Sequence, residues 1–134
     1  MITALPLLLK PTTQSKNVTF HCDFHVDEDD ESLFDGVAVG VWERGGISLT
    51  LMTVTSNYNI VINPRLYQEG PEYSQRVYGY LSTNNTNNSS RLTVELADMT
   101  EYGDRSYGCS MYFGPFREPL GSSLSIDVKG KNTC

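Results

Sequence analysis

The stretch Tyr107-Gly108-Cys109, taken together with Cys22 and Trp42, decides the fold of this chain. The two cysteines lie far apart in the sequence, each inside a run in which apolar and polar residues alternate. Trp42 lies between them in a third such run. This arrangement is typical of two facing β-sheets joined by one disulfide bond, with an indole packed against it. The sequence therefore predicts an all-β sandwich.

Length and charge limit the class of protein. A chain of 134 residues forms one domain with its own core. Its net charge of −6 argues against nucleic acid or an anionic membrane surface as a partner, since both require clustered Lys and Arg. No apolar run approaches the roughly 18 to 20 residues that span a bilayer. The opening run Ile2–Leu9 has no basic segment before it and no small-residue cleavage site after it, so we expect a first strand there.

The cysteines and the glycosylation sequons indicate an oxidising compartment. Cys22 and Cys109 both lie in predicted strands, and we expect them to pair. Cys134 is left over, either for an interchain bond or for a partner in a longer chain. Paired cysteines persist in secreted and extracellular proteins. Four asparagines match the N-glycosylation pattern, namely Asn17, Asn84, Asn87 and Asn88.

Alternating hydrophobicity predicts about nine short strands with tight turns between them. Besides the opening run, the predicted strands cover residues 18–24, 37–43, 47–54, 58–62, 75–81, 91–96, 106–113 and 124–128. The expected core positions include Trp42, Leu92, Val94 and Tyr107.

The strand over residues 37–43 is apolar on both sides. If Trp42 points inward, then Val37, Val39 and Val41 point outward. The outer side of an antiparallel sheet usually carries polar residues. Two interpretations remain open: loops of the chain cover the valines, or the valines form an apolar surface for another protein. We favour the second.

Neither a metal site nor an active site is expected. A calcium-binding loop that starts at Asp27 would need glycine at its sixth position, where this chain has Ser32. The acidic run over residues 25–32 is therefore expected to be a solvated loop. His21 and His25 lie at one strand end, and the chain has no nucleophile elbow, phosphate-binding loop or Cys-x-x-Cys motif. We expect no enzyme activity and no cofactor.

Together these residues resemble an immunoglobulin V-set domain over residues 7–129. The resemblance rests on Cys22, Trp42, Leu92-Thr93-Val94, Tyr107 and Cys109, and on the extra pair of strands that follows Trp42. It implies a two-sheet Greek-key sandwich over residues 1–129, followed by a polar tail or stalk over residues 130–134. It also implies that the Tyr107 hydroxyl returns to backbone just upstream.

The chain departs from the family pattern at two places. Arg105 lies two residues before Tyr107, where the family has glycine or alanine. The Phe-Gly-x-Gly motif of antigen receptors is absent around residues 120–123. The second departure argues against an antigen-receptor variable domain and for a germline-encoded surface receptor.

The resemblance implies an extracellular recognition or adhesion domain, part of a type I membrane protein whose anchor lies outside this chain. Such a domain binds a protein, itself or another, through the face of strands C, C′, F and G. A secreted or viral decoy and an accessory subunit of a membrane complex are the alternatives. The face is predicted to carry Val39, Val41, Glu43, Ser110, Tyr112, Phe116 and Arg117. Phe113 and Phe116 have a second interpretation, which is packing into the end of the sandwich.

Overall fold

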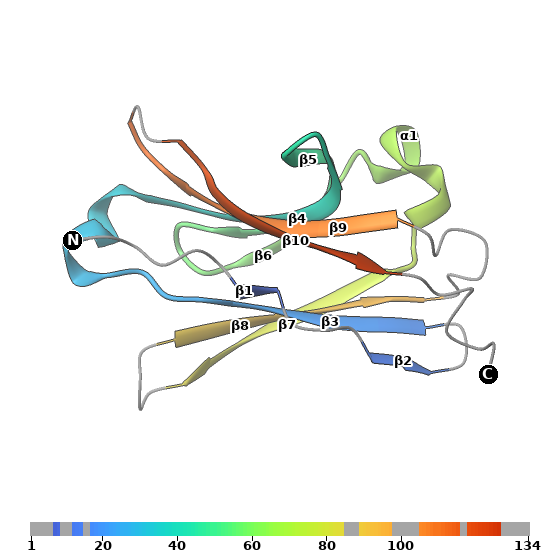
Figure 1. Cartoon of the computed structure of the whole chain (residues 1–134), viewed down its shortest axis with the longest axis horizontal. Helices are drawn as coiled ribbons and strands as arrows, with labels where there is room; N and C mark the ends of the chain where they lie inside the picture. The colour runs from blue at the N-terminus through green and yellow to red at the C-terminus, as the bar shows by residue number, and fades with distance from the viewer. Residues whose placement is uncertain are drawn as a thin grey trace.

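The computed structural model describes residues 7–8, 12–14, 17–84, 89–97, 105–115 and 118–126. Two antiparallel β-sheets face each other in it (Figure 1). Sheet 1 has the strand order β1-β3-β8-β7, with β2 also paired to β3, and sheet 2 has the order β10-β9-β4-β5-β6. This arrangement confirms the prediction of an all-β sandwich.

The strands of sheet 1 are β1 (Leu7–Leu8), β2 (Thr12–Gln14), β3 (Asn17–Phe24), β7 (Val77–Asn84) and β8 (Ser89–Leu96). Those of sheet 2 are β4 (Phe34–Glu43), β5 (Gly46–Thr55), β6 (Ile60–Ile62), β9 (Arg105–Phe113) and β10 (Leu120–Ile126).

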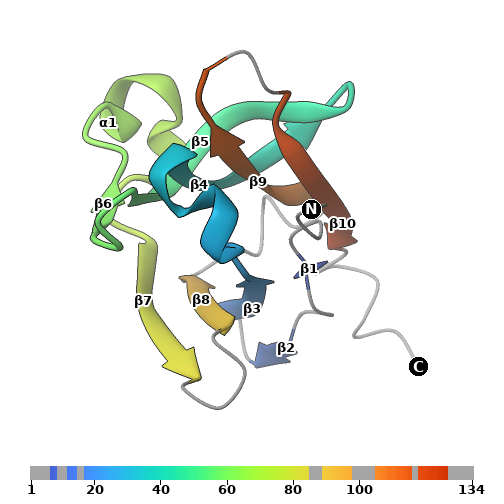
Figure 2. The ribbon, with the colours of Figure 1, turned by 90° about the vertical axis from the view of Figure 1, so that its left-hand side faces the viewer.

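Short helices connect the two sheets. The acidic run expected as a loop contains a 3₁₀ helix, Glu28–Leu33, which leads from β3 into β4. Helix α1 (Leu66–Glu69) and the 3₁₀ helix Pro71–Tyr73 lie between β6 and β7. Figure 2 shows α1 on the side of β6, away from β10. These two helices form one wall of the candidate site.

A disulfide bond joins the sheets through the core. Cys22 of β3 is bonded to Cys109 of β9, as the sequence predicted. Fully burying an aliphatic or aromatic side chain contributes about 1.5–3 kcal/mol, so the core around this bond supplies most of the stabilisation. The side chains that fill it include Val18, Phe20, Leu92, Val94 and Leu96 from sheet 1, and Val37, Val39, Leu51, Met52, Tyr107 and Met111 from sheet 2.

Val39 and Val41 face this core. In the register of β4 with β9, Val39 lies opposite Cys109 and Val41 lies opposite Tyr107. Directly opposite residues of an antiparallel pair share a face, and Cys109 points toward sheet 1. The valines are 0% and 6% exposed. The prediction that their side chains point outward is therefore wrong.

A β-bulge bends the pairing of β4 with β5. Val39 lies opposite Met52, whereas the next residue, Gly40, lies opposite Thr50. Leu51 is thus an extra residue, and both Leu51 and Met52 are fully buried. A Cβ on Gly40 would overlap the carbonyl oxygen of Leu49, so this close approach requires glycine.

Candidate functional site

Trp42 lies on the outer face of sheet 2. Its side chain is half-buried. A Cβ on Gly121 would lie 2.5 Å from Cη2 and 3.0 Å from Cζ3 of the indole. Because β9 lies between β4 and β10, the indole reaches across the outer side of β9. The prediction that Trp42 packs against the disulfide is wrong, because the inward positions of β4 are those of the valines.

Small residues form the floor of the outer face of sheet 2 beside this indole. Ala38 and Ser110 lie opposite each other in register, and Gly121 lies opposite Ser110 on its other side. Ala38 is 5% and Ser110 3% exposed, although both are on the outer face. The Oγ of Ser110 would lie 2.9 Å from the same Cβ on Gly121 that the indole approaches. Ser110, predicted as a surface contact, is therefore buried.

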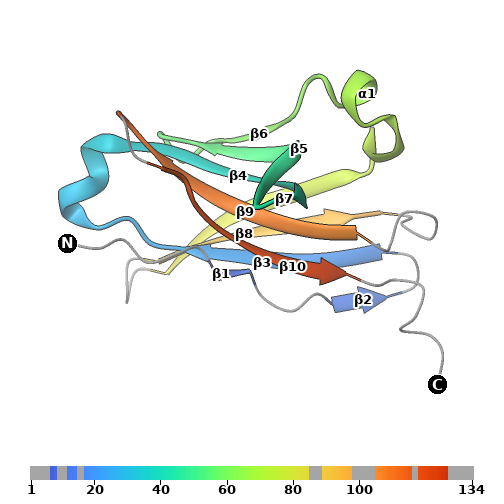
Figure 3. The same ribbon diagram turned by 45° about the horizontal axis from the view of Figure 1, so that its top comes forward.

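An open hollow of about 550 Å³ adjoins Trp42 at one end of sheet 2. Strands β4, β5 and β9 supply one side of it, and α1 with the following 3₁₀ helix supplies the other. Figure 3 shows α1 rising beyond the end of this sheet. The hollow is lined by Val41, Trp42, Glu43, Ser48, Leu49, Glu69, Glu72, Arg105 and Ser106.

A hydrogen-bond network holds the helical wall against β9. Arg105 Nη1 donates to Glu72 Oε2 at 3.1 Å and to the Tyr73 hydroxyl at 3.2 Å. The hydroxyls of Tyr73 and Tyr107 are 2.7 Å apart. Burial is the main cause that raises the pKa of both tyrosines above 10.0. The resemblance implied a hydrogen bond from the Tyr107 hydroxyl to the backbone just upstream. Residues 98–104 of that stretch are outside the described part of the chain, so this bond stays a prediction.

The charge of the hollow is negative on balance. Three carboxylates line it, and Arg105 is bound to one of them, Glu72. Glu69 Oε1 accepts a hydrogen bond from Asn63 Nδ2 at 3.0 Å. Glu43 is exposed beside Trp42. The hollow therefore combines an aromatic surface with carboxylates.

The remaining predicted surface residues have different locations. Tyr112 is half-buried on the outer side of β9. Phe113 is 4% exposed and its ring centroid lies 5.8 Å from that of Phe34, so it packs into the end of the sandwich. Phe116 and Arg117 lie outside the described residues.

The other predicted positions are as follows. Leu92 and Val94 are fully buried. Asn17 is exposed at the start of β3, and Asn84 ends β7. Asn87, Asn88 and Cys134 are not among the residues that the structure describes.

Sequence reasoning missed the wall of the hollow. Glu69, Glu72 and Tyr73 come from a connection that the sequence marked only as a loop. One signal was present, because Arg105 replaces the small residue that the V-set pattern has two positions before Tyr107. A long cation at that position requires an acidic partner, and Glu72 supplies it.

The described part of the chain contains no group of three or more His, Cys, Asp or Glu side chains placed to hold a metal ion. It also contains no helix with the length and apolarity needed to cross a bilayer. In comparisons with known proteins, neither a family model nor a curated protein sequence matches this chain.

Proposed function

We propose that this chain is an extracellular recognition domain of the immunoglobulin V-set type, which binds another protein through the outer face of sheet 2. The strand order supports the fold assignment. In a variable-type domain, strands C′ and C″ extend the sheet of strands G, F and C, and strands A, B, E and D form the other sheet. The orders β10-β9-β4-β5-β6 and β1-β3-β8-β7 correspond to this arrangement.

The disulfide bond supports an extracellular location. The bond between Cys22 and Cys109 needs an oxidising environment to form and persist. The secretory pathway provides that environment, and Asn17 within its glycosylation sequon is exposed. A cell-surface receptor is the function class that we propose.

The position of Trp42 outside the sandwich carries the proposal. A half-buried indole on a sheet face leaves apolar area in water, which a partner can cover. Tryptophan is among the residues that dominate binding energy at interfaces. The small residues Ser110 and Gly121 let the indole lie close to the sheet, so its outer surface is the part that a partner would contact.

The surroundings of Trp42 match the anatomy of an interface. The exposed Glu43 follows Trp42 along β4, and the half-buried Tyr112 supplies a second polar group on the same outer face. A polar rim around an aromatic centre is the usual arrangement at specific protein interfaces. The two alternative functions, a secreted decoy and an accessory subunit of a membrane complex, would use the same face.

The test compares one variant on each outer face. Fluorescent tetramers of the domain are bound to cells of the source organism before and after protease treatment of the cells. We expect protease-sensitive binding that Trp42→Ala abolishes and Arg91→Ala, which removes an exposed side chain from the outer face of sheet 1, leaves intact. Equal binding by both variants would contradict the proposal. Sedimentation at increasing concentration, with the same variants, separates self-association from binding to a different protein.

A further inference from the structure

A second hollow lies on the opposite side of the molecule, on the outer face of sheet 1. Its volume is about 230 Å³, and Thr19, Tyr78, Gly79, Tyr80, Thr93 and Glu95 line it. Tyr78 is 52% and Tyr80 62% exposed. The two rings leave apolar area in water beside the hollow, and a ligand could cover that area.

The strand register brings these side chains to one face. Tyr78 lies opposite Glu95, and Tyr80 lies opposite Thr93. Gly79, between the tyrosines, faces the core, where a Cβ would lie 2.6 Å from Cε of Met52. The two rings therefore stand on the same outer face of β7, with the polar side chains of β8 beside them.

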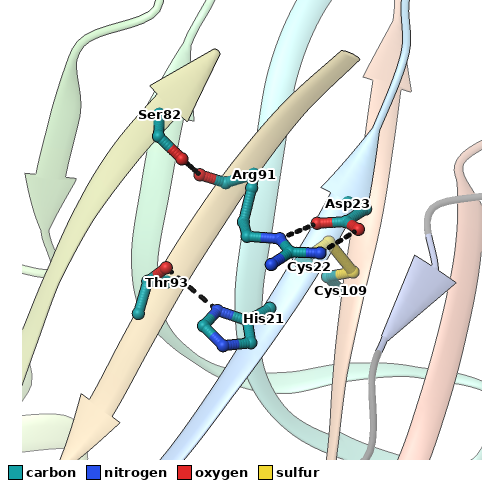
Figure 4. A network of polar contacts seen from close by, with 7 residues as sticks. All are labelled: His21, Cys22, Asp23, Ser82, Arg91, Thr93 and Cys109. Carbon is teal, nitrogen blue, oxygen red and sulfur yellow. Dashed lines mark hydrogen bonds and ion pairs between the residues drawn. A yellow bond between two sulfur atoms is a disulfide. The ribbon is translucent and has the colours of Figure 1, made fainter. Parts of the chain in front are cut away.

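Hydrogen bonds fix part of the hollow before any ligand binds. The Tyr78 hydroxyl donates to the carbonyl oxygen of Gln75 at 3.0 Å, which holds the ring in place. Nδ1 of His21 lies 3.0 Å from Oγ1 of Thr93, and Thr93 is 6% exposed (Figure 4). A preformed wall and floor reduce the entropy that binding would otherwise cost.

The charge on this hollow is negative. Of the residues that line it, Glu95 alone carries a charge, and no hydrogen bond or ion pair to its carboxylate occurs among the described residues. Arg91, on the same strand and face, is held by Asp23 through bonds of 2.7 and 2.9 Å (Figure 4). This bidentate pair leaves the Glu95 carboxylate available to a cation from outside.

We propose that this hollow binds an alkylated ammonium group of the choline type. The faces of the Tyr78 and Tyr80 rings attract a cation through their quadrupoles, and the methyl groups of such a cation pack against apolar surface. The Glu95 carboxylate balances the charge. A bare ammonium is more strongly hydrated and gains less from two aromatic rings. This site is separate from the face around Trp42 and does not depend on the proposed function.

The test titrates the isotopically labelled domain with choline and monitors the NMR chemical shifts of the residues around the hollow. The neutral isostere of choline, 3,3-dimethylbutan-1-ol, is titrated in parallel. We expect saturable shifts with choline and none with the isostere. Tyr80→Ala and Glu95→Gln should each weaken binding about five-fold or more, because each removes one attractive contact.

Tyr67→Ala is the matched control, since Tyr67 is 64% exposed on α1 and does not line the hollow. It should bind choline as the unmodified domain does. Unchanged fluorescence of Trp42 verifies that each variant is folded. Equal binding of choline and its isostere, or undiminished binding by Glu95→Gln, would overturn the proposal. Vesicles of phosphatidylcholine in a parallel arm distinguish a lipid headgroup from a free solute as the source of the group.

Discussion

The two sides of β4 carry apolar residues for different reasons. On the inner side, Val37, Val39 and Val41 alternate and pack around the disulfide, under the cover of sheet 1. On the outer side, Ala38 is small and Trp42 is large, and no second sheet among the described residues covers them. The inner side fills a space of about 10 Å between sheets, whereas on the outer side the indole lies against Gly121 of β10.

This difference shows that the largest apolar residue of a strand need not mark its buried side. The inner side is defined by its pairing with Cys109, not by residue size. An indole on the outer side is free to contact a second protein, and the inner valines are not. The predictions below test this division, in order of decreasing expected effect.

The largest effect should come from the bond at the centre of the inner side. Cys22 and Cys109 are 87 positions apart, and opening a loop of this length should lower the free energy of unfolding by about 4–5 kcal/mol. We expect reduction, or Cys22→Ser, to unfold the domain or to lower its denaturation midpoint sharply. Chemical denaturation with and without reductant measures this. A denaturation midpoint that does not change with reductant would contradict the expected contribution of the bond to stability.

A matched pair of valine substitutions compares a buried with an exposed side chain. Val39→Thr places a hydroxyl of similar size in a fully buried site and should cost about 1–3 kcal/mol. Val61→Thr makes the same change on β6, where the side chain is 43% exposed, and should cost less than about 0.5 kcal/mol. Urea denaturation of both variants gives the difference. Equal costs would place Val39 outside the core.

The Tyr73–Tyr107 pair should make the domain sensitive to alkali. Burial raises the pKa of both phenols in the folded state, so folding keeps them protonated. Their stabilising contribution is complete below pH 10 and is lost as the pH rises above it. Tyr107→Phe should cost about 1 kcal/mol at neutral pH and should reduce this alkaline loss. Thermal melts across the alkaline range measure it, and an unchanged pH profile in the variant would contradict the assignment.

The smallest effect on stability should come from the outer floor. A Cβ at Gly121 would overlap the indole edge, so Gly121→Ala should displace Trp42. We expect a cost of about 1 kcal/mol or less, because the ring can move outward into solvent. The emission maximum of the single tryptophan should shift to the red. Gly46→Ala serves as the control, since nothing lies within 4 Å of a Cβ there. Identical emission spectra for the two variants would contradict the contact between the indole and Gly121.

The sequence predicted the strands and the disulfide because period-two alternation and cysteine placement are local signals. Leu92 and Val94 alternate with polar residues, so their inward direction was readable. The strand with Val39 and Trp42 is apolar on both sides, and alternation alone cannot orient such a strand. Its orientation comes from pairing with Cys109, which depends on residues far away in the sequence.

The candidate site was predicted only in part. Alternation assigned Tyr112 to the outer face, where it is half-buried. Glu43 is exposed at the end of its strand, but the alternation that assigned it outward also assigned Val39 and Val41 outward, and for the valines it was wrong. The opposite wall of the hollow was not predictable, because Glu72 is positioned by Arg105 of β9 and Glu69 by Asn63. Such contacts leave no periodic signal. The unusual Arg105 was the local sign that an acidic partner was needed.

Collisional quenching of Trp42 by acrylamide tests the central claim most directly. The domain has a single tryptophan, so its fluorescence reports on one position. Acrylamide is neutral and therefore suits a protein with a net charge of −6. An indole on the outer face predicts substantial quenching in the folded domain, part-way toward that of the unfolded chain. Quenching close to zero in the folded domain, with blue-shifted emission, would place Trp42 in the core and contradict the account.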